Sequence, residues 1–286
     1  MKMIKANNLA CPIDGNKLVQ SEKQLVCDNE HSFDLARQGY VNLLPVQHKR
    51  SKEPGDSKEM VIARSSFLNS GVYEPIAKKL TEIVQSHIKG VDKACLLDAG
   101  CGEGYYFDYL YKQFQSLDAD SELSFIGLDI SKHAIIDASK RNKNITWVVG
   151  TNRQPPVCNK SVDVVLCVFG FQSFEGFNKI LRDKGKVILV EAGVNHLKEL
   201  REIIYSEVKK TEPPRLIEAE KLGFSLTETQ ELQFATGNID NKTINQLLLM
   251  TPHFFRANKE GQKVAMNLKE LNLTVDVVFR TLEKIE

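Results

Sequence analysis

Apolar residues follow two different spacings along most of the chain. Val162–Val168 is almost continuously apolar, which is typical of a strand covered on both faces of a parallel sheet. From Tyr73 to Lys89 apolar residues instead recur at helical spacing. These two patterns alternate, which predicts a doubly wound α/β sheet. The expected helices are 57–69, 73–89, 105–116, 195–209 and 240–250, with another opening at Ser131, and the expected strands are 94–98, 124–129, 146–149, 162–168, 185–191, 224–232 and 273–282.

The amino-terminal part lacks this alternation. Residues 1–36 contain one short strand candidate, 24–27, and too few apolar residues for a core of their own. Such a module needs a metal or docking onto a neighbour. We therefore predict three parts: a small module over 1–36, a basic connector over 37–70, and a Rossmann-like domain over 71–286.

Composition narrows the class of protein only slightly. The chain has 286 residues, a net charge of +1, 42% hydrophobic and 26% charged residues, as an ordinary soluble globular protein has. This balance gives no bulk signal for nucleic acid or membrane. The first residues lack the apolar core of a signal peptide, and no apolar run reaches the roughly 18 residues of a membrane span. The six cysteines are expected to be buried thiols, which favours a cytoplasmic location.

A glycine-rich turn carries the clearest chemical signal. An apolar strand runs into Asp98-Ala-Gly-Cys-Gly-Glu-Gly104, and the next strand ends at Asp129, where an acid accepts hydrogen bonds from ribose hydroxyls. Gly100 and Gly102 permit positive φ angles and close approach of a ligand to the main chain. The turn lacks the glycine spacing of a dinucleotide site, and Asp98 would repel a phosphate but suits an ammonium group. The pattern favours S-adenosylmethionine over NAD or FAD.

Two further polar residues are candidates near this turn. Glu103 is either a solvated turn residue or a contact to the cofactor. His196 follows the strand 185–191, on the carboxyl side of the sheet, where ligands bind. A lone histidine is more often structural, but this position favours a functional role.

A second constellation lies in the amino-terminal module. Cys11-x2-Asp14 and Cys27-x3-His31 have the spacing of a tetrahedral zinc site built from two short turns. The alternative is a metal-free module with two buried thiols. Zinc would hold the shape of the module and perform no chemistry.

The connector contains a short basic run. Lys49, Arg50 and Lys52 are expected to contact phosphates, because the run lies between the candidate zinc module and the cofactor domain; in isolation the same run would be a solvated loop.

The chain resembles the RlmA-type 23S rRNA (guanine-N1-)-methyltransferases over nearly its whole length. The matching stretches are Cys11-Pro12, Cys27, His31–Asp34, Gly39–Ser51, Pro54–Ser57, Asp98–Tyr106, Gly127–Asp129 and Thr251-Pro252. The segment from Gly39 to Ser57 is far more specific than the glycine motif, which many unrelated methyltransferases share.

The resemblance implies a class I methyltransferase fold with an amino-terminal zinc ribbon. It also implies methyl transfer from S-adenosylmethionine to N1 of a guanine in a hairpin loop of 23S rRNA, with the ribbon gripping the RNA, in a homodimer. The family's cofactor contacts correspond to Tyr73, Gly102, Glu103 and His196.

The resemblance also assigns zinc ligands and exposes three departures, one of which is the turn Asp183-Lys184-Gly185-Lys186, where the family usually has Pro-Gly-Gly. The family's ligand positions correspond to Cys11, residue 14, Cys27 and His31, and here Asp14 stands where the family has cysteine. The loop 169–173, which commonly faces the methyl acceptor in this fold, also differs from the family.

Two other functions remain open at this point. A small-molecule methyltransferase on the same fold would make no use of residues 1–36. A non-catalytic cofactor-binding RNA or ribosome assembly factor would follow if the changed loop had lost turnover. The sequence names no general base.

Overall fold

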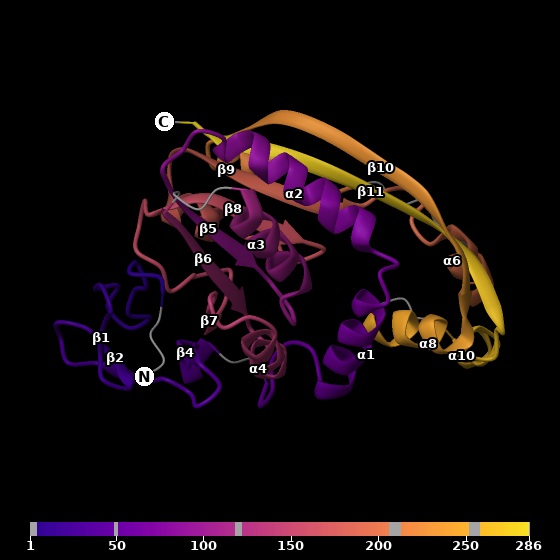
Figure 1. The fold of residues 1–286 in the computed structure, drawn as a ribbon, viewed down its shortest axis with the longest axis horizontal. Helices are drawn as coiled ribbons and strands as arrows, with labels where there is room; N and C mark the ends of the chain where they lie inside the picture. Colours follow the sequence, from indigo (N-terminus) through magenta and orange to yellow (C-terminus); the bar gives the residue numbers. More distant parts are fainter. Residues whose placement is uncertain (1–4, 49–50, 118–121, 206–212, 252–257, 286) are drawn as a thin grey trace.

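The structure is a computed structural model that describes residues 5–48, 51–117, 122–205, 213–251 and 258–285. It contains a three-stranded sheet and an eight-stranded sheet, which lie at one end and in the centre of the molecule (Figure 1).

The small antiparallel sheet belongs to the amino-terminal module. It consists of β1 (Val19–Ser21), β2 (Gln24–Val26) and β3 (Ser32–Asp34). The module docks onto the rest of the chain, because the Ala10 amide donates to the Pro156 carbonyl at 3.0 Å and the Cys158 amide donates to the Asn8 carbonyl at 2.8 Å. Docking onto a neighbour, one of the two supports expected for so small a module, is therefore present; the other, a metal, stays a prediction.

The large sheet forms the frame of the molecule. Its strands, from one edge to the other, are β10 (Phe224–Asp240), β11 (Glu270–Lys284), β9 (Leu181–Ala192), β8 (Val162–Val168), β5 (Lys93–Ala99), β6 (Glu122–Asp129), β7 (Thr146–Val149) and β4 (Tyr40–Asn42). The expected parallel sheet is confirmed except at β11, which runs antiparallel to both of its neighbours. This strand returns beside β10 after two helices at the far end, so its direction is reversed.

Helices flank these strands. They are α1 (Lys58–Asn69), α2 (Glu74–Ile88), α3 (Tyr105–Leu117), α4 (Lys132–Arg141), α5 (Phe174–Ile180), α6 (Lys198–Ile204), α7 (Ile217–Lys221), α8 (Asn241–Met250) and α10 (Lys259–Met266), with a 3₁₀ turn at Val46–His48. Ser131 caps α4 as predicted, since its Oγ accepts from the Ala134 amide. The helix expected over 195–209 is shorter: Leu197 adopts a left-handed conformation before α6, and the extended backbone of Tyr205 ends the helix at Ile204. Residues 206–212 of this expectation lie outside the described residues.

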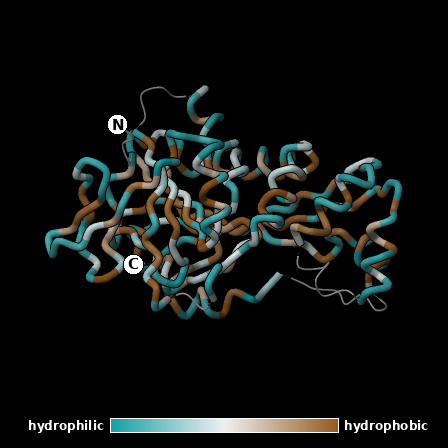
Figure 2. The backbone as a smooth tube through the Cα atoms, turned by 90° about the horizontal axis from the view of Figure 1, so that it is seen from below, coloured by the Kyte–Doolittle hydropathy of each residue, from teal (hydrophilic) through white to brown (hydrophobic). Residues whose placement is uncertain are grey.

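Alternate residues of the central strands enter two separate cores. Leu96 and Val164 pack with α2 and α3 on one face, whereas Leu97 and Val165 pack with α5 and the amino-terminal module on the other. Figure 2 shows the hydrophobic segments gathered inside the wider part of the molecule. Each central strand is therefore covered on both faces, which explains its continuous apolar sequence.

The segment expected as a connector contributes to the large fold. β4 pairs in parallel with β7 at the sheet edge, and α1 packs against α8 at the far end of the molecule (Figure 1). The division into 1–36, 37–70 and 71–286 stays a prediction, although β4 joins the connector to the large sheet.

Two expectations about cysteines and membranes can be compared with the structure. All six cysteines are free thiols, and all but Cys158 are buried. Among the helices in the described part of the chain, none combines the length and apolar character that crossing a bilayer requires.

Candidate functional site

A cavity of about 960 Å³ opens at the carboxyl ends of the central strands. The chain reverses its strand order here, since β6 and β7 extend from one side of β5 while β8 and β9 extend from the other. A doubly wound sheet binds ligands at such a switch point. The residues expected at the site all line this cavity: Tyr73, Asp98, Gly100, Gly102, Glu103, Asp129 and His196.

The glycine-rich turn forms one wall of the cavity. Gly100 and Gly102 have φ angles of 89° and 56°, which side chains rarely adopt. The Gly100 amide donates to the Leu128 carbonyl at 2.7 Å, so the turn is tied to β6. A Cβ atom on either glycine would meet nothing closer than 3.6 Å. The space in front of the turn is therefore available to a ligand.

Asp98 presents a buried carboxylate to the cavity. Its exposure is 2%, and its Oδ1 has no hydrogen-bond partner among the described residues. Burial, together with the charges of Asp129 and Glu103, raises the pKa of Asp98 to about 8. An unpartnered buried acid is costly, and a cationic ligand group would remove this cost. The feature fits the ammonium group of an amino-acid cofactor.

Asp129 connects the glycine turn to α4. Its Oδ2 accepts from the Gly102 amide at 2.9 Å, and its Oδ1 accepts from the Ser131 amide at 2.7 Å. Burial raises the pKa of Asp129, and these two amide bonds oppose the rise. Each carboxylate oxygen has a second lone pair, so the side chain can still accept hydrogen bonds from a ligand in the cavity.

Glu103 is held by protein groups. Its Oε2 accepts from the Tyr105 amide at 3.0 Å at the start of α3, and its Oε1 lies 3.4 Å from the Arg141 guanidinium. Burial raises the pKa of Glu103, and Arg141 opposes the rise. The interpretation of Glu103 as a solvated turn residue is wrong, because Glu103 is only 1% exposed.

Tyr73 and His196 meet across the cavity. The Tyr73 hydroxyl lies 3.2 Å from His196 Nε2, while His196 Nδ1 accepts from the Asp276 amide at 3.3 Å. Because Nδ1 is an acceptor, this network assigns the proton of the neutral ring to Nε2, which then donates to the Tyr73 oxygen. Burial raises the pKa of Tyr73 well above its usual range, so its hydroxyl keeps a proton that it can donate.

The loop after β8 forms the opposite wall. Phe169 has a φ angle of 49°, and its ring lies 5.8 Å from the His196 ring and 6.5 Å from the Tyr73 ring. Phe171 is 56% exposed, and the Arg153 guanidinium lies 4.8 Å from its ring centroid. Two accessible aromatic rings beside the cavity can stack on a base.

Sequence reasoning missed three residues that line the cavity. Arg64 projects from α1, Asn152 follows β7, and Tyr106 lies in the first turn of α3 with a buried hydroxyl that has no partner among the described residues. Arg64 and Asn152 had no detectable signal, because neither lies in a motif. Tyr106 directly follows the glycine turn and could have been considered.

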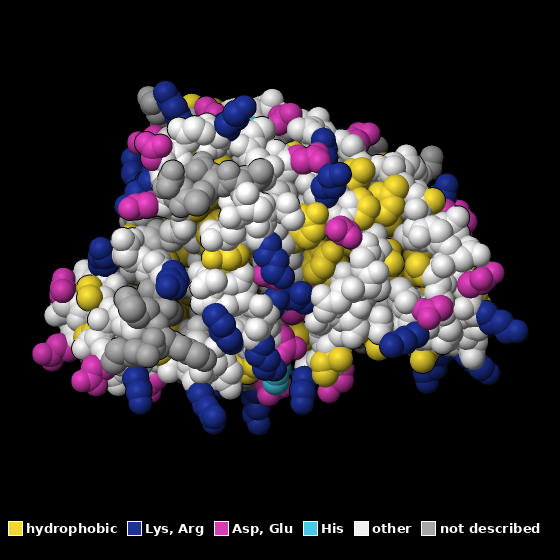
Figure 3. All heavy atoms as spheres, in the orientation of Figure 1, with side chains coloured by type: hydrophobic (Ala, Val, Ile, Leu, Met, Phe, Trp, Pro, Cys, Tyr) yellow, Lys and Arg dark blue, Asp and Glu magenta, His cyan; other side chains and the backbone are white. Residues whose placement is uncertain are grey.

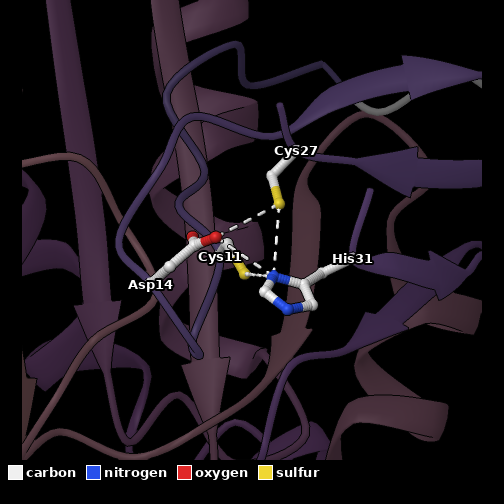
Figure 4. Close-up of side chains that lie close together, drawn as sticks. All are labelled: Cys11, Asp14, Cys27 and His31. Carbon is white, nitrogen blue, oxygen red and sulfur yellow. Dashed lines mark hydrogen bonds and ion pairs between the residues drawn. The ribbon is translucent and has the colours of Figure 1, made fainter. Parts of the chain in front are cut away.

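The four expected metal ligands converge in the amino-terminal module (Figure 4). Their ligand atoms all lie within 4.8 Å of one another. His31 Nδ1 is 3.6 Å from Cys11 Sγ, 3.4 Å from Cys27 Sγ and 3.1 Å from Asp14 Oδ2. Tetrahedral zinc, with bonds of about 2.0–2.3 Å, places its ligand atoms roughly 3.3–3.8 Å apart. The cluster therefore has the dimensions of a zinc site.

The electrostatics of this cluster favour a cation. Burial raises the pKa of the Cys11 thiol to about 11, whereas the Asn16 amide, which donates to Asp14 Oδ1 at 2.9 Å, holds the pKa of Asp14 below its usual range. Asp14 is thus ionised and ready to accept a cation, whereas the Cys11 thiol would have to release its proton to solvent before a metal could bind to its sulfur.

Known protein families match both the amino-terminal module and the domain that contains the cavity. The family model described as "RlmA, N-terminal", a zinc ribbon, matches residues 9–52, and a methyltransferase-domain model matches 96–193. A methyltransferase structure from Bacillus halodurans C-125 overlaps 73% of this chain and 99% of its own, with 13% identity and a TM-score of 0.46.

Relatives match over most of the chain. A Micromonospora griseorubida protein named as a 23S rRNA (guanine-N(1)-)-methyltransferase is 31% identical over 210 residues, covering 68% of each chain. The 23S rRNA (guanine(748)-N(1))-methyltransferase of Streptomyces fradiae is 28% identical over 277 residues, covering 95% of each. A Bacillus subtilis protein named for guanine-N(1) methylation of 23S rRNA is 29% identical over 277 residues, covering 93% of this chain and 94% of its own.

The strand order and the methyltransferase-domain match define a class I S-adenosylmethionine-dependent methyltransferase. Its amino-terminal ribbon and its full-length relatives identify the group more closely. The chain belongs to the RlmA family of 23S rRNA (guanine-N1-)-methyltransferases.

Proposed function

We propose that this protein transfers a methyl group from S-adenosylmethionine to N1 of a guanine in a hairpin loop of 23S rRNA. The observation that carries this proposal is the union of two features in one chain: an RlmA ribbon, and a cavity in which Asp98 presents an unpartnered carboxylate beside a glycine turn. The first supports an rRNA substrate, and the second supports an amino-acid-bearing nucleoside as the donor.

The cofactor-facing residues have separate tasks in this proposal. When bound, S-adenosylmethionine supplies a methyl group that its sulfonium centre already activates. Asp98 pairs with the ammonium group, Asp129 accepts from the ribose hydroxyls, and the main chain at Gly100 and Gly102 contacts the cofactor closely. Alignment of the acceptor with the methyl carbon supplies most of the rate enhancement.

Tyr73 and His196 complete the cofactor pocket. With His196 donating to its oxygen, the Tyr73 hydroxyl directs its own proton toward the cavity, where it can meet a carboxylate oxygen of the cofactor. Glu103 stays a predicted cofactor contact, and its bonds to the Tyr105 amide and Arg141 suggest that it acts by fixing the turn.

A methyl-transfer assay tests the function. Radiolabelled cofactor, purified protein and unmodified 23S rRNA are expected to give labelled RNA, with the product mapped to N1 of one guanine. Label in RNA at another atom, or no label in RNA with turnover of small molecules, would contradict the proposal. Cofactor binding without any turnover would favour the non-catalytic assembly factor.

The RNA surface is proposed to include Lys49, Arg50, Lys52 and the ribbon. Lys49 and Arg50 lie outside the described residues, and Lys52 is exposed. Figure 3 shows Lys and Arg side chains, with Asp and Glu among them, along the lower edge of one face, where Figure 1 draws the ribbon, α4 and α1. Such a row of cations can track a phosphate backbone. The homodimer implied by the family stays a prediction.

Replacing Lys49 and Arg50 together with alanine is expected to weaken RNA binding and to flatten its salt dependence. Each lost phosphate contact lowers the slope of log K against log salt by about 0.9, or about 0.7 on a single strand. A salt titration of hairpin binding measures this slope. Lys78→Ala/Lys79→Ala on α2 is the matched control. An unchanged slope in the first variant, with S-adenosylhomocysteine affinity intact, would remove the basic run from the RNA surface.

We further propose that the ribbon holds zinc through Cys11, Asp14, Cys27 and His31. Two thiolates, a carboxylate and an imidazole form an acceptable but weaker set than the three thiolates and imidazole of the family, because zinc in structural sites favours thiolate sulfur.

Asp14→Cys is therefore expected to raise zinc affinity by roughly tenfold or more, measured by competition with a chromophoric chelator. Asp28→Cys adds an exposed thiol nearby without joining the cluster and serves as the control. Equal affinities in the two variants would contradict the assignment of Asp14 as a ligand.

A further inference from the structure

We propose that Gln172 recognises the 2-amino group of the acceptor guanine, and that Glu191 and Arg280 fix the side chain for this task. The inference rests on the proposed function and adds to it the residues that select the base. Gln172 would be the specificity-determining residue, and Glu191 a positioning residue that acts through it.

Three side chains from three distant segments form this arrangement. Gln172 follows β8, Glu191 lies near the end of β9, and Arg280 lies on the neighbouring strand β11. Gln172 Nε2 donates to Glu191 Oε1 at 2.7 Å, and Arg280 Nε donates to Glu191 Oε2 at 2.6 Å. Glu191 and Arg280 are 7% and 8% exposed, so they form a buried ion pair that holds the Gln172 side chain.

The Glu191–Arg280 pair determines which end of the Gln172 amide faces the ligand. A carboxylate paired with a guanidinium only accepts hydrogen bonds, so the Gln172 amide must direct its nitrogen toward Glu191. Its oxygen Oε1 is then the outward group. Within the described residues, no hydrogen bond is made to this oxygen. A fixed acceptor is therefore presented to the cavity that Gln172 lines.

The position of Gln172 places it beside the base. It belongs to the same loop as Phe169 and Phe171, whose rings are 42% and 56% exposed. The cofactor side of the cavity lies over β5 and β6, whereas this loop and Glu191 lie over β8 and β9. A base stacked on the aromatic rings would turn its Watson–Crick edge toward the sheet ends.

Guanine matches a fixed acceptor at that edge. Its N1 must face the methyl group, which leaves the adjacent 2-amino group to donate to Gln172 Oε1. Adenine has no amino group at this position, and its unprotonated N1 offers no donor to the same oxygen. Inosine differs from guanosine only by lacking the 2-amino group, and it therefore isolates this single contact.

The test compares two synthetic RNA hairpins that carry either guanosine or inosine at the methylated position mapped with 23S rRNA. The wild-type protein is expected to methylate the guanosine hairpin with a kcat/KM roughly tenfold higher, the value of one well-placed hydrogen bond in a desolvated site. Gln172→Met keeps the length of the side chain and removes the acceptor. It is expected to lower the guanosine kcat/KM to the inosine level without changing the inosine value.

Two further variants separate specificity from folding. Gln154→Met changes an exposed glutamine that does not line the cavity and should keep the wild-type ratio. Glu191→Gln frees the Gln172 amide to rotate and should reduce the guanosine-to-inosine ratio while S-adenosylhomocysteine affinity stays unchanged. This last readout would move if the substitution had only damaged the fold.

The outcomes distinguish this inference from the function on which it rests. No methyl transfer to the guanosine hairpin by the wild-type protein would overturn the proposed function. Transfer to both hairpins with equal kcat/KM, or an unchanged ratio in Gln172→Met, would overturn only the role of Gln172. An unchanged ratio in Glu191→Gln would overturn the positioning role of Glu191.

Discussion

Asp98→Asn is expected to weaken S-adenosylmethionine binding by roughly 100-fold or more while raising the thermal stability of the ligand-free protein. Cofactor affinity falls because removing one partner of a buried charge pair costs about 2–5 kcal/mol. Thermal stability rises because the ligand-free protein must bury an acid that has no partner at Oδ1. Calorimetry with the cofactor and thermal unfolding without it measure the two effects.

The stability gain has a defined pH dependence. Burial in the folded protein raises the pKa of Asp98 from the ordinary range of a free aspartate to about 8, so this carboxyl destabilises the fold progressively as pH rises from about 4 to 8. Asparagine removes that penalty. The advantage of Asp98→Asn should therefore be roughly 2–4 kcal/mol at pH 7 and disappear near pH 4. Asp137→Asn is the control, because this half-buried α4 residue pairs with Lys140 and does not line the cavity.

Cofactor binding should also depend on pH through Asp98. Below pH 8 the free carboxyl holds a proton, which an arriving ammonium group must displace. Affinity should then rise by up to about tenfold per pH unit between pH 6 and 7. Calorimetry in buffers of different ionisation enthalpy would detect the released proton. Binding to the wild-type protein without proton release at pH 6.5 would contradict the assigned pair.

Gly127→Ala is expected to destabilise the fold by about 3 kcal/mol or more, the upper range for overpacking a core. A Cβ at Gly127 would lie 2.2 Å from Cζ3 and 2.3 Å from Cε3 of Trp147. The indole cannot retreat easily, because it is fully buried and its Nε1 donates to the Asn142 carbonyl at 2.8 Å. Since β6 also positions Asp129, cofactor binding should weaken as well.

Thermal unfolding measures this change, with an expected fall in Tm of roughly 6–12 °C for a chain of this size. Gly237→Ala is the control, because nothing lies within 4 Å of a Cβ there and only the positive φ opposes it. Gly127→Ala/Trp147→Leu should recover part of the lost stability. Equal Tm values for Gly127→Ala and Gly237→Ala would exclude the clash with Trp147.

Local sequence pattern was sufficient for the central strands and the cofactor wall. β7 and β8 begin and end where their apolar runs predict, and Asp98 and Asp129 lie at adjacent strand ends as expected. These features depend on residues that are close in sequence. Strand periodicity and the glycine turn are therefore enough to predict them.

Features that depend on distant pairing could not be read from the sequence. β10 is 17 residues long, and the sequence indicated only its first half. Most residues of this strand are polar and exposed or half-buried, so its second half has no clear apolar pattern. The pairing of Gln172, Glu191 and Arg280 requires the registers of β8, β9 and β11 together. The same holds for Arg64, which reaches the cavity only because α1 packs against α8.

The two attachments of the ribbon have a consequence for substrate choice. The Asn8–Cys158 and Ala10–Pro156 bonds hold it from one side, and β4 ties the following segment to the sheet edge. These attachments fix the separation of the ribbon and the cavity. On the RNA surface proposed above, a hairpin whose stem is lengthened by a few base pairs is therefore expected to present the wrong nucleotide to the methyl donor.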